Sequence, residues 1–141
     1  MYLLDTNVIS ELRRAKPHGA VVAWLESVPD AALHISALSL GEIQGGVEKL
    51  RQRDAQKALE IEHWADQVEQ TFAVLPIDSR IFRLHARWMF ARSDHAYEDA
   101  LIAATAQVHG LTLVTRNVRD FAPFDVPLFD PFTFAGGLSP P

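Results

Sequence analysis

Short apolar runs alternate with longer amphipathic segments along this chain. The runs are only a few residues long and are bounded by turn-forming residues, so they predict buried strands rather than helices. The predicted strands span residues 2–4, 32–36, 72–77 and 111–115, with a short edge strand at 126–129. Pro127 favours an edge position for the last strand, because proline cannot donate to a central ladder.

Between these runs, apolar residues recur at the spacing of a helix. Leu40, Ile43 and Val47, for example, fall on one face of a predicted helix. The predicted helices span residues 8–14, 20–27, 39–51, 55–71, 79–92 and 97–109. Gly110 supplies a C-terminal stop for the last of them. Strands that alternate with helices predict an α/β fold with a mainly parallel sheet and right-handed crossovers.

The composition is that of one globular domain. Its 141 residues predict a single domain over residues 1–135 and a loose tail over 136–141. The absence of cysteine excludes a disulfide framework, a thiolate zinc site and a cysteine nucleophile. The sequence has no leader-like start and no apolar run of about 18 residues. We therefore expect a cytoplasmic protein that does not enter a membrane.

Acidic residues follow or precede the predicted strands at corresponding places. Asp5 directly follows the first strand, and Glu42 lies in the first turn of the helix after the second. Asp99 lies in the first turn of the helix that precedes the fourth strand, and Asp120 follows that strand. Ligand sites in parallel sheets form beyond the C-terminal ends of the strands. The topology therefore predicts that these four carboxylates meet at one edge of the sheet.

Each acidic residue also has a purely structural interpretation. Asp5 can cap the helix that follows it. Ser39 and Glu42 match the S-x-x-E capping box, with Ser39 as N-cap. Asp99 can favour a helix start through the macrodipole, and residues 117–120 can form a capped turn.

Taken together, the four carboxylates favour a metal site. Clustered carboxylates repel one another unless a cation lies between them. Their hard oxygen atoms suit Mg²⁺ or Mn²⁺, and such ions support phosphoryl displacement by water. The net charge of −5 argues against nucleic-acid binding through bulk positive charge, but a bound cation reverses the local sign. These features predict a metal-dependent phosphodiesterase.

Four ordered segments of the sequence resemble the motifs of one family. They are residues 3–12 around Asp5, 36–43 around Glu42, 99–106 from Asp99, and 113–121 around Asp120. In these segments the chain resembles the PIN-domain ribonucleases, and more closely the VapC toxins, including their FitB-like branch. The resemblance covers nearly the whole chain, and four motifs in family order are far more specific than one.

The resemblance implies a three-layer α/β/α fold and an endoribonuclease that uses Mg²⁺, with Mn²⁺ able to substitute. RNA would be hydrolysed by metal-activated water. Carried over to this sequence, Asp5 and Asp99 would be the main metal ligands, Glu42 would complete the acidic triad and Asp120 would be the fourth acid. Supporting residues would position carboxylates or water: Thr6, Asn7, Thr115 and Asn117.

Glu98 stands beside Asp99 in the sequence. Adjacent residues on a helix point about 100° apart. We therefore expect only one of the two, Asp99, to enter the site.

The resemblance further implies a toxin of a VapBC-type toxin–antitoxin system. Its partner would be a small VapB-type antitoxin that wraps the toxin, in a homodimer or a larger assembly, and operator DNA would be bound through the antitoxin. The sequence adds candidate RNA contacts at Arg13, Arg116 and Arg119, because basic side chains near a cleft can hold phosphates. An ordinary solvated surface is the alternative interpretation of these arginines.

Two other functions compete with a nuclease. A haloacid-dehalogenase-type phosphatase would use Asp5 as nucleophile, but it requires a second aspartate two residues later as general acid. Asn7 occupies that position and cannot transfer a proton. A non-catalytic α/β interaction module would use the carboxylates only as caps and would bind no divalent ion.

Overall fold

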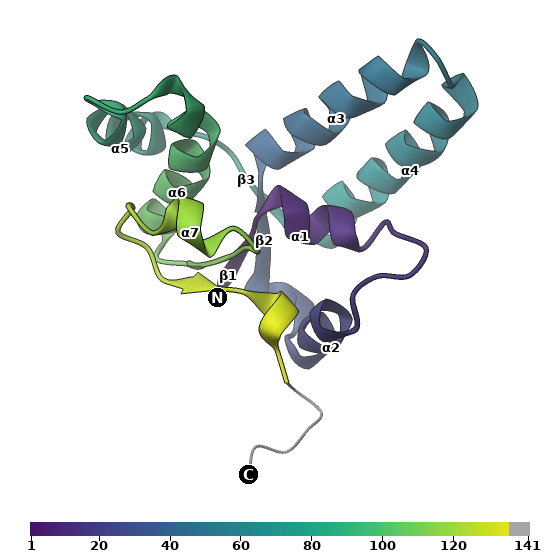
Figure 1. Cartoon of the computed structure of the whole chain (residues 1–141), viewed down its shortest axis with the longest axis horizontal. Helices are drawn as coiled ribbons and strands as arrows, with labels where there is room; N and C mark the ends of the chain where they lie inside the picture. The colour runs from purple at the N-terminus through teal and green to yellow at the C-terminus, as the bar shows by residue number, and fades with distance from the viewer. Residues whose placement is uncertain (136–141) are drawn as a thin grey trace.

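A five-stranded parallel sheet forms the centre of the molecule (Figure 1). The computed structural model describes residues 1–135. The strands are β1 (Tyr2–Leu4), β2 (Leu33–Ser36), β3 (Ala73–Leu75), β4 (Thr112–Val114) and β5 (Leu128–Phe129), arranged in the order β3-β2-β1-β4-β5. Every pair of neighbours is parallel, which confirms the predicted α/β class.

Helices cover both faces of the sheet. They are α1 (Thr6–Glu11), α2 (Gly19–Ser27), α3 (Ala37–Arg51), α4 (Ala55–Thr71), α5 (Ser79–Met89), α6 (Tyr97–His109) and α7 (Val118–Phe121). Successive strand residues point to opposite faces. Leu3 and Leu113 accordingly pack with α6 and α7, whereas Leu4 and Val114 pack with α1, α2 and α4. Two buried cores on either side of one sheet confirm the predicted three-layer arrangement.

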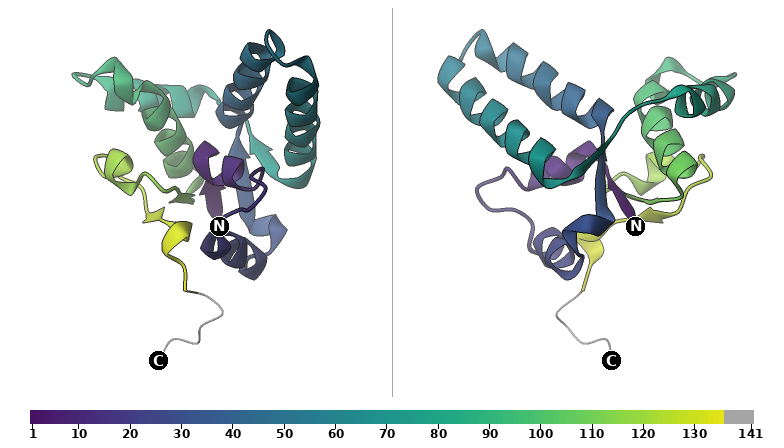
Figure 2. Two further views of the ribbon diagram at one scale, coloured as in Figure 1. Left: turned by 45° about the vertical axis from the view of Figure 1, so that its right-hand side comes forward. Right: turned by 180° about the vertical axis from the view of Figure 1, so that it is seen from behind.

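Two helical arms rise from the sheet on opposite sides. Helices α3 and α4 pack against each other as one arm, and α5 and α6 form the other. Seen from behind, the two arms diverge in a V (Figure 2). Helix α3 starts where β2 ends, and the chain enters α6 at the same edge of the sheet before returning along β4. The carboxyl edge of the sheet therefore lies between the arms.

Helices α1 and α3 each begin two residues earlier than predicted, because a residue at the end of the preceding strand or directly after it caps the helix. Helix α1 begins at Thr6, whose N–H donates to Asp5 Oδ1 at 2.8 Å. Helix α3 begins at Ala37 with Ser36 as its N-cap, and Ser36 Oγ accepts from the Leu38 N–H at 3.0 Å. The alternative interpretation of Ser39 as the N-cap of a capping box is therefore wrong.

Other boundaries differ where the backbone leaves regular geometry. Helix α5 ends at Met89 instead of residue 92, since Phe90 leaves the helical region with a ψ of 124° and Ala91 adopts a left-handed φ of 63°. Residues 117–120, for which a capped turn was the alternative interpretation, overlap the short helix α7. Strand β5 is an edge strand, as predicted, but it begins only after Pro127.

Within the described part of the chain, no helix is long and apolar enough to cross a membrane. The predicted tail, residues 136–141, lies outside the described residues.

Candidate active site

Asp5 is fixed at the carboxyl end of β1 by three donors. Its side chain is buried, with 9% of its surface exposed. Oδ1 accepts from the Thr6 N–H, while Oδ2 accepts from Thr115 Oγ1 at 2.8 Å and from Asn7 Nδ2 at 3.2 Å. Burial raises the pKa of Asp5, and the hydrogen bonds from Thr115 and Thr6 oppose that rise. The structure thus holds this carboxylate in one orientation through residues that follow two neighbouring strands, β1 and β4.

The predicted supporting residues connect the first and last motifs. Thr115 is fully buried at the end of β4, and its Oγ1 accepts from the Asn117 N–H at 3.0 Å while donating to Asp5. Asn7 Oδ1 accepts from the Arg116 N–H at 3.4 Å. The loop after β4 is therefore tied to the beginning of α1, and both of these segments border Asp5.

Glu42 is oriented by a chain of two hydroxyl groups. Thr6 Oγ1 lies 2.9 Å from Glu42 Oε1 and 2.8 Å from Ser39 Oγ. An ionised carboxylate can only accept, so Thr6 donates to Glu42 and accepts from Ser39. Ser39 is fully buried one turn before Glu42, inside α3. Sequence reasoning missed this role of Ser39, because the S-x-x-E pattern offered Ser39 only as the N-cap of a possible capping box. The same i, i+3 spacing places the Ser39 and Glu42 side chains on one helix face.

Glu42 has an unusually high proton affinity. Burial is the main cause that raises the pKa of Glu42 to about 7, and the hydrogen bond from Thr6 opposes it. A hydrogen bond with Glu98 and the negative charges of Glu98 and Asp5 act in the same direction as burial. Glu98 thus borders the same site as Asp99, which corrects the expectation that only one of them would. Two side chains that diverge on α6 can both face this site, because α3 approaches from the opposite arm.

Asp99 and Asp120 complete the group of carboxylates. Partial burial raises the pKa of Asp99, and the charges of Asp5, Asp120 and Glu98 raise it further. Asp99 serves no cap, since α6 has Ala96 as N-cap without a side-chain hydrogen bond. Asp120 is exposed on α7. The structure therefore brings all four predicted acids into one neighbourhood where their charges act on one another.

The donor set fits a hard divalent cation. Every candidate ligand is a carboxylate oxygen, which is the ligand type that Mg²⁺ and Mn²⁺ prefer. Among residues 1–135, no three acidic or histidine side chains are arranged to hold one metal ion. Mg²⁺ does not require such a cage, because it usually binds one or two carboxylates and keeps several waters.

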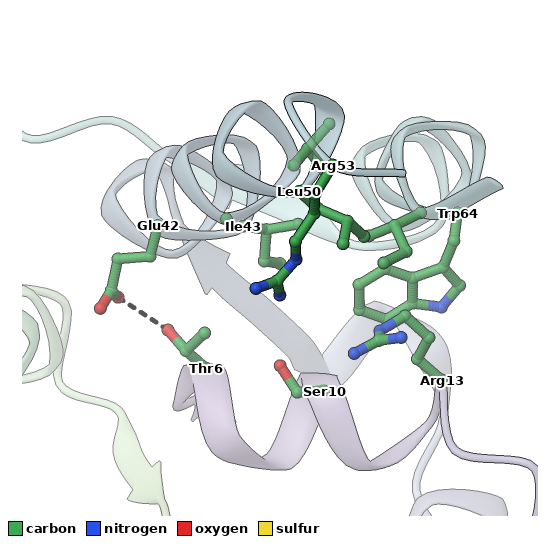
Figure 3. Close-up of a pocket in the computed structure, with 11 residues that line it drawn as sticks. Thr6, Ser10, Arg13, Glu42, Ile43, Leu50, Arg53 and Trp64 are labelled. Carbon is green, nitrogen blue, oxygen red and sulfur yellow. Dashed lines mark hydrogen bonds between the residues drawn. The ribbon is translucent and has the colours of Figure 1, made fainter. Parts of the chain in front are cut away.

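The three candidate RNA-contact arginines are all exposed around this group. Arg116 follows Thr115, and its guanidinium carbon lies 4.4 Å from the centroid of the Phe132 ring. Arg119 lies on α7 beside Asp120. Arg13 lines a pocket between α1 and the α3–α4 arm, and Thr6 and Glu42 lie at the end of the pocket that faces the acidic group (Figure 3).

Comparison with known proteins places this geometry in a family. Residues 2–125 match the PIN domain family. The chain is 36% identical to Toxin FitB of Neisseria gonorrhoeae, over 94% of this chain and 99% of that protein. It is 33% identical to VapC ribonuclease Y4jK of Sinorhizobium fredii, over 94% and 98%.

Solved structures agree with the sequence comparison. The chain matches the toxin fold in a structure of FitAB bound to an IR36 DNA fragment with a TM-score of 0.81 and 34% identity, covering 94% of this chain and 96% of that one. A toxin–antitoxin complex from Klebsiella pneumoniae matches with a TM-score of 0.69 and 28% identity, covering 93% and 98%. With its parallel sheet, its acidic group at the carboxyl edge and these relatives, the chain belongs to the PIN-domain family, in the group of the VapC and FitB toxins.

Proposed function

We propose that this protein is the toxin of a VapBC-type toxin–antitoxin system and acts in the cytoplasm as a Mg²⁺-dependent endoribonuclease. The observation that carries the proposal is the convergence of acidic side chains from four separate segments at the carboxyl edge of the sheet. Burial raises the pKa of Glu42 and of Asp99, and the charges of neighbouring carboxylates raise both further. Such a group is stabilised by a divalent cation, and relatives that align with nearly the whole chain are named ribonucleases.

Distinct roles are proposed for the acidic residues. Asp5 and Asp99 would be the principal metal ligands, with Glu42 and Asp120 as further ligands. When bound, the ion would lower the pKa of water and offset charge that develops on the phosphate. Thr115 and Asn7 hold the Asp5 carboxylate by hydrogen bonds, Thr6 holds that of Glu42, and Asn117 anchors the loop that carries Thr115.

The proposed partners follow from the relatives. Several similar structures are complexes of a toxin with its antitoxin, and some also contain DNA. We propose that a VapB-type antitoxin covers the acidic site, that operator DNA is bound only through the antitoxin, and that the toxin forms a homodimer or a larger assembly with it. Arg13, Arg116 and Arg119 surround the site and are proposed to contact RNA phosphates.

Cleavage assays with purified protein test the enzymatic proposal. Transfer, ribosomal and messenger RNAs are incubated with wild type, Asp5→Asn and Asp99→Asn in Mg²⁺, in Mn²⁺ and in a chelator. We expect cleavage only with a divalent ion, 5′-phosphate ends, and at least a hundredfold loss in both variants. Asp66→Asn is the matched control, since Asp66 is exposed on α4. Full metal-dependent cleavage by both site variants would contradict the proposal.

Growth assays test the toxin role separately. Induction of the chain alone should arrest growth, and co-expression of the neighbouring gene should restore it. Induction of Asp99→Asn should leave growth unchanged. Normal growth on induction of wild type, with the protein confirmed to accumulate, would count against a toxin even if the protein cleaves RNA.

A further inference from the structure

A pocket opens directly beside Glu42, between α1 and the α3–α4 arm (Figure 3). Its volume is about 310 Å³. That is at the lower end of the range of about 300–1,000 Å³ found for small-ligand sites. Glu42 belongs both to the acidic group and to this pocket, and Thr6, which hydrogen-bonds with Glu42, also lines the pocket. A molecule that reaches the acidic group can therefore extend into the pocket.

Two arginines from different elements share this pocket. Arg13 follows α1 and Arg53 follows α3, and both guanidinium groups point into the same space (Figure 3). Within residues 1–135 neither arginine forms an ion pair, although the chain as a whole carries a net charge of −5. Like charges directed at one another are unfavourable unless an anion lies between them. The pair therefore directs positive charge into the pocket that no salt bridge within residues 1–135 neutralises, although Glu42 lines the other end of the pocket.

The remaining wall of the pocket is apolar and includes an aromatic ring. Ile43, Leu50 and Trp64 line it, and Trp64 is only partly buried. Bases stack on exposed aromatic side chains in many single-strand binding proteins. One pocket thus offers a charged side for a phosphate and an apolar side for a base.

We propose that this pocket holds the nucleotide next to the scissile phosphate of RNA, with Arg13 and Arg53 on its phosphate and Trp64 against its base. The inference rests on the proposed ribonuclease function and assigns a substrate subsite to it. A polynucleotide fits better than an acidic peptide, because its phosphates repeat along the chain. One phosphate can lie at the carboxylates while the next reaches the arginines and a base meets the apolar wall.

Direct binding tests the subsite without requiring cleavage. A short, fluorescently labelled single-stranded RNA of mixed sequence is titrated against Asp99→Asn protein, and Arg13→Gln and Arg53→Gln are then added to that background. We expect each arginine variant to weaken binding about fivefold to tenfold. Each should also lower the slope of log Kd against log salt by about 0.7, the value for one lost phosphate contact on a single strand. Arg53→Lys should restore the slope.

The matched control is Arg83→Gln, which removes the same charge from the exposed face of α5. It should change neither the affinity nor the slope. Trp64 provides a second signal: its fluorescence should be quenched by the RNA, and Trp64→Phe should abolish that quenching. In proteins with Asp99 intact, Arg53→Gln should raise KM about fivefold to tenfold while kcat stays within about twofold.

Each alternative outcome has a defined meaning. RNA affinity that is unchanged in both arginine variants would overturn the subsite, even if wild type cleaves RNA. Loss of binding to the protein encoded by the neighbouring gene, with RNA binding intact, would assign the pocket to a protein partner and also overturn the proposal. Failure of wild type to cleave any RNA would contradict the proposed function, while the binding titration would still decide whether the pocket holds RNA.

Discussion

At the scale of single residues, the position of the Asp5 carboxylate depends on the buried hydroxyl of Thr115. This hydroxyl donates to Asp5 Oδ2 at 2.8 Å and lowers a pKa that burial raises. Thr115→Val keeps the shape of the side chain and removes the donor. We expect the pKa of Asp5 to rise, and this rise should shift the pH–rate profile measurably to higher pH. The free energy of unfolding should fall by about 1–2 kcal/mol.

Thr105→Val is the control for this change. Thr105 is also fully buried, but its Oγ1 donates to the Leu101 carbonyl within α6 and not to the acidic group. The control should lose stability by a similar amount and keep the wild-type pH–rate profile. Identical profiles for the two variants would show that the Thr115 hydroxyl does not tune the site.

Glu42 is expected to reduce stability at neutral and alkaline pH. The pKa of Glu42 is raised from 4.5 to about 7 in the folded protein. Its favourable contribution to the free energy of unfolding is therefore fully present below pH 4.5 and is lost as pH rises through about 7. Glu42→Gln should therefore raise the melting temperature that is measured in chelator at about pH 8. In a separate assay with Mg²⁺, RNA cleavage by the same variant should fall. Glu42 is exposed enough that screening reduces the effect to about 1 kcal/mol, or roughly 3 °C.

The comparison at lower pH checks the sign of this effect. At about pH 5 the folded protein holds Glu42 mainly protonated, so glutamine and glutamate should give nearly equal melting temperatures. Glu60→Gln is the matched control, because Glu60 is exposed on α4. A Glu42→Gln variant that is less stable than wild type at about pH 8 would contradict the raised pKa of Glu42.

At the scale of elements, α3 has low intrinsic stability. It contains Gly41, Gly45 and Gly46, and a Cβ atom at any of them would meet nothing within 4 Å. Glycine in a helix interior is less favourable than alanine by about 1 kcal/mol. Gly45→Ala should raise the free energy of unfolding by about that amount in chemical denaturation, without altering RNA cleavage. Gly45 does not line the pocket beside Glu42, whereas Gly46 does. A destabilised Gly45→Ala protein would show that this face of α3 is covered in solution.

The helices and strands were largely predictable because their apolar periodicity is strong. The errors fall where two local signals compete. Ser36 and Ser39 are both good cap residues, and only the tertiary structure shows that Ser36 caps α3 while Ser39 hydrogen-bonds with Thr6. The same limit explains the end of α5, where an arginine-rich helical pattern continues past the left-handed Ala91.

At the scale of the whole molecule, the topology of a parallel sheet was enough to predict that Asp5, Glu42, Asp99 and Asp120 would converge. It was not enough to predict which other side chains join them. Glu98 borders Glu42 only because α6 and α3 approach from opposite arms. Arg53 reaches the pocket of Arg13 from the far end of α3, and no local sequence signal relates residues so distant along the chain.

The whole fold should also respond to a divalent cation. An ion that binds only the folded state stabilises it, by about 1.4 kcal/mol at ten times its Kd. We expect Mg²⁺ at about 10 mM to raise the melting temperature by roughly 3–5 °C at about pH 8, relative to choline chloride of equal ionic strength. At about pH 6 the rise should be smaller. The pKa of Glu42, which is raised to about 7, allows protons to compete with the ion there. Asp99→Asn should lose most of the response and Asp66→Asn should keep it, whereas an equal response in both would place the ion elsewhere on the surface.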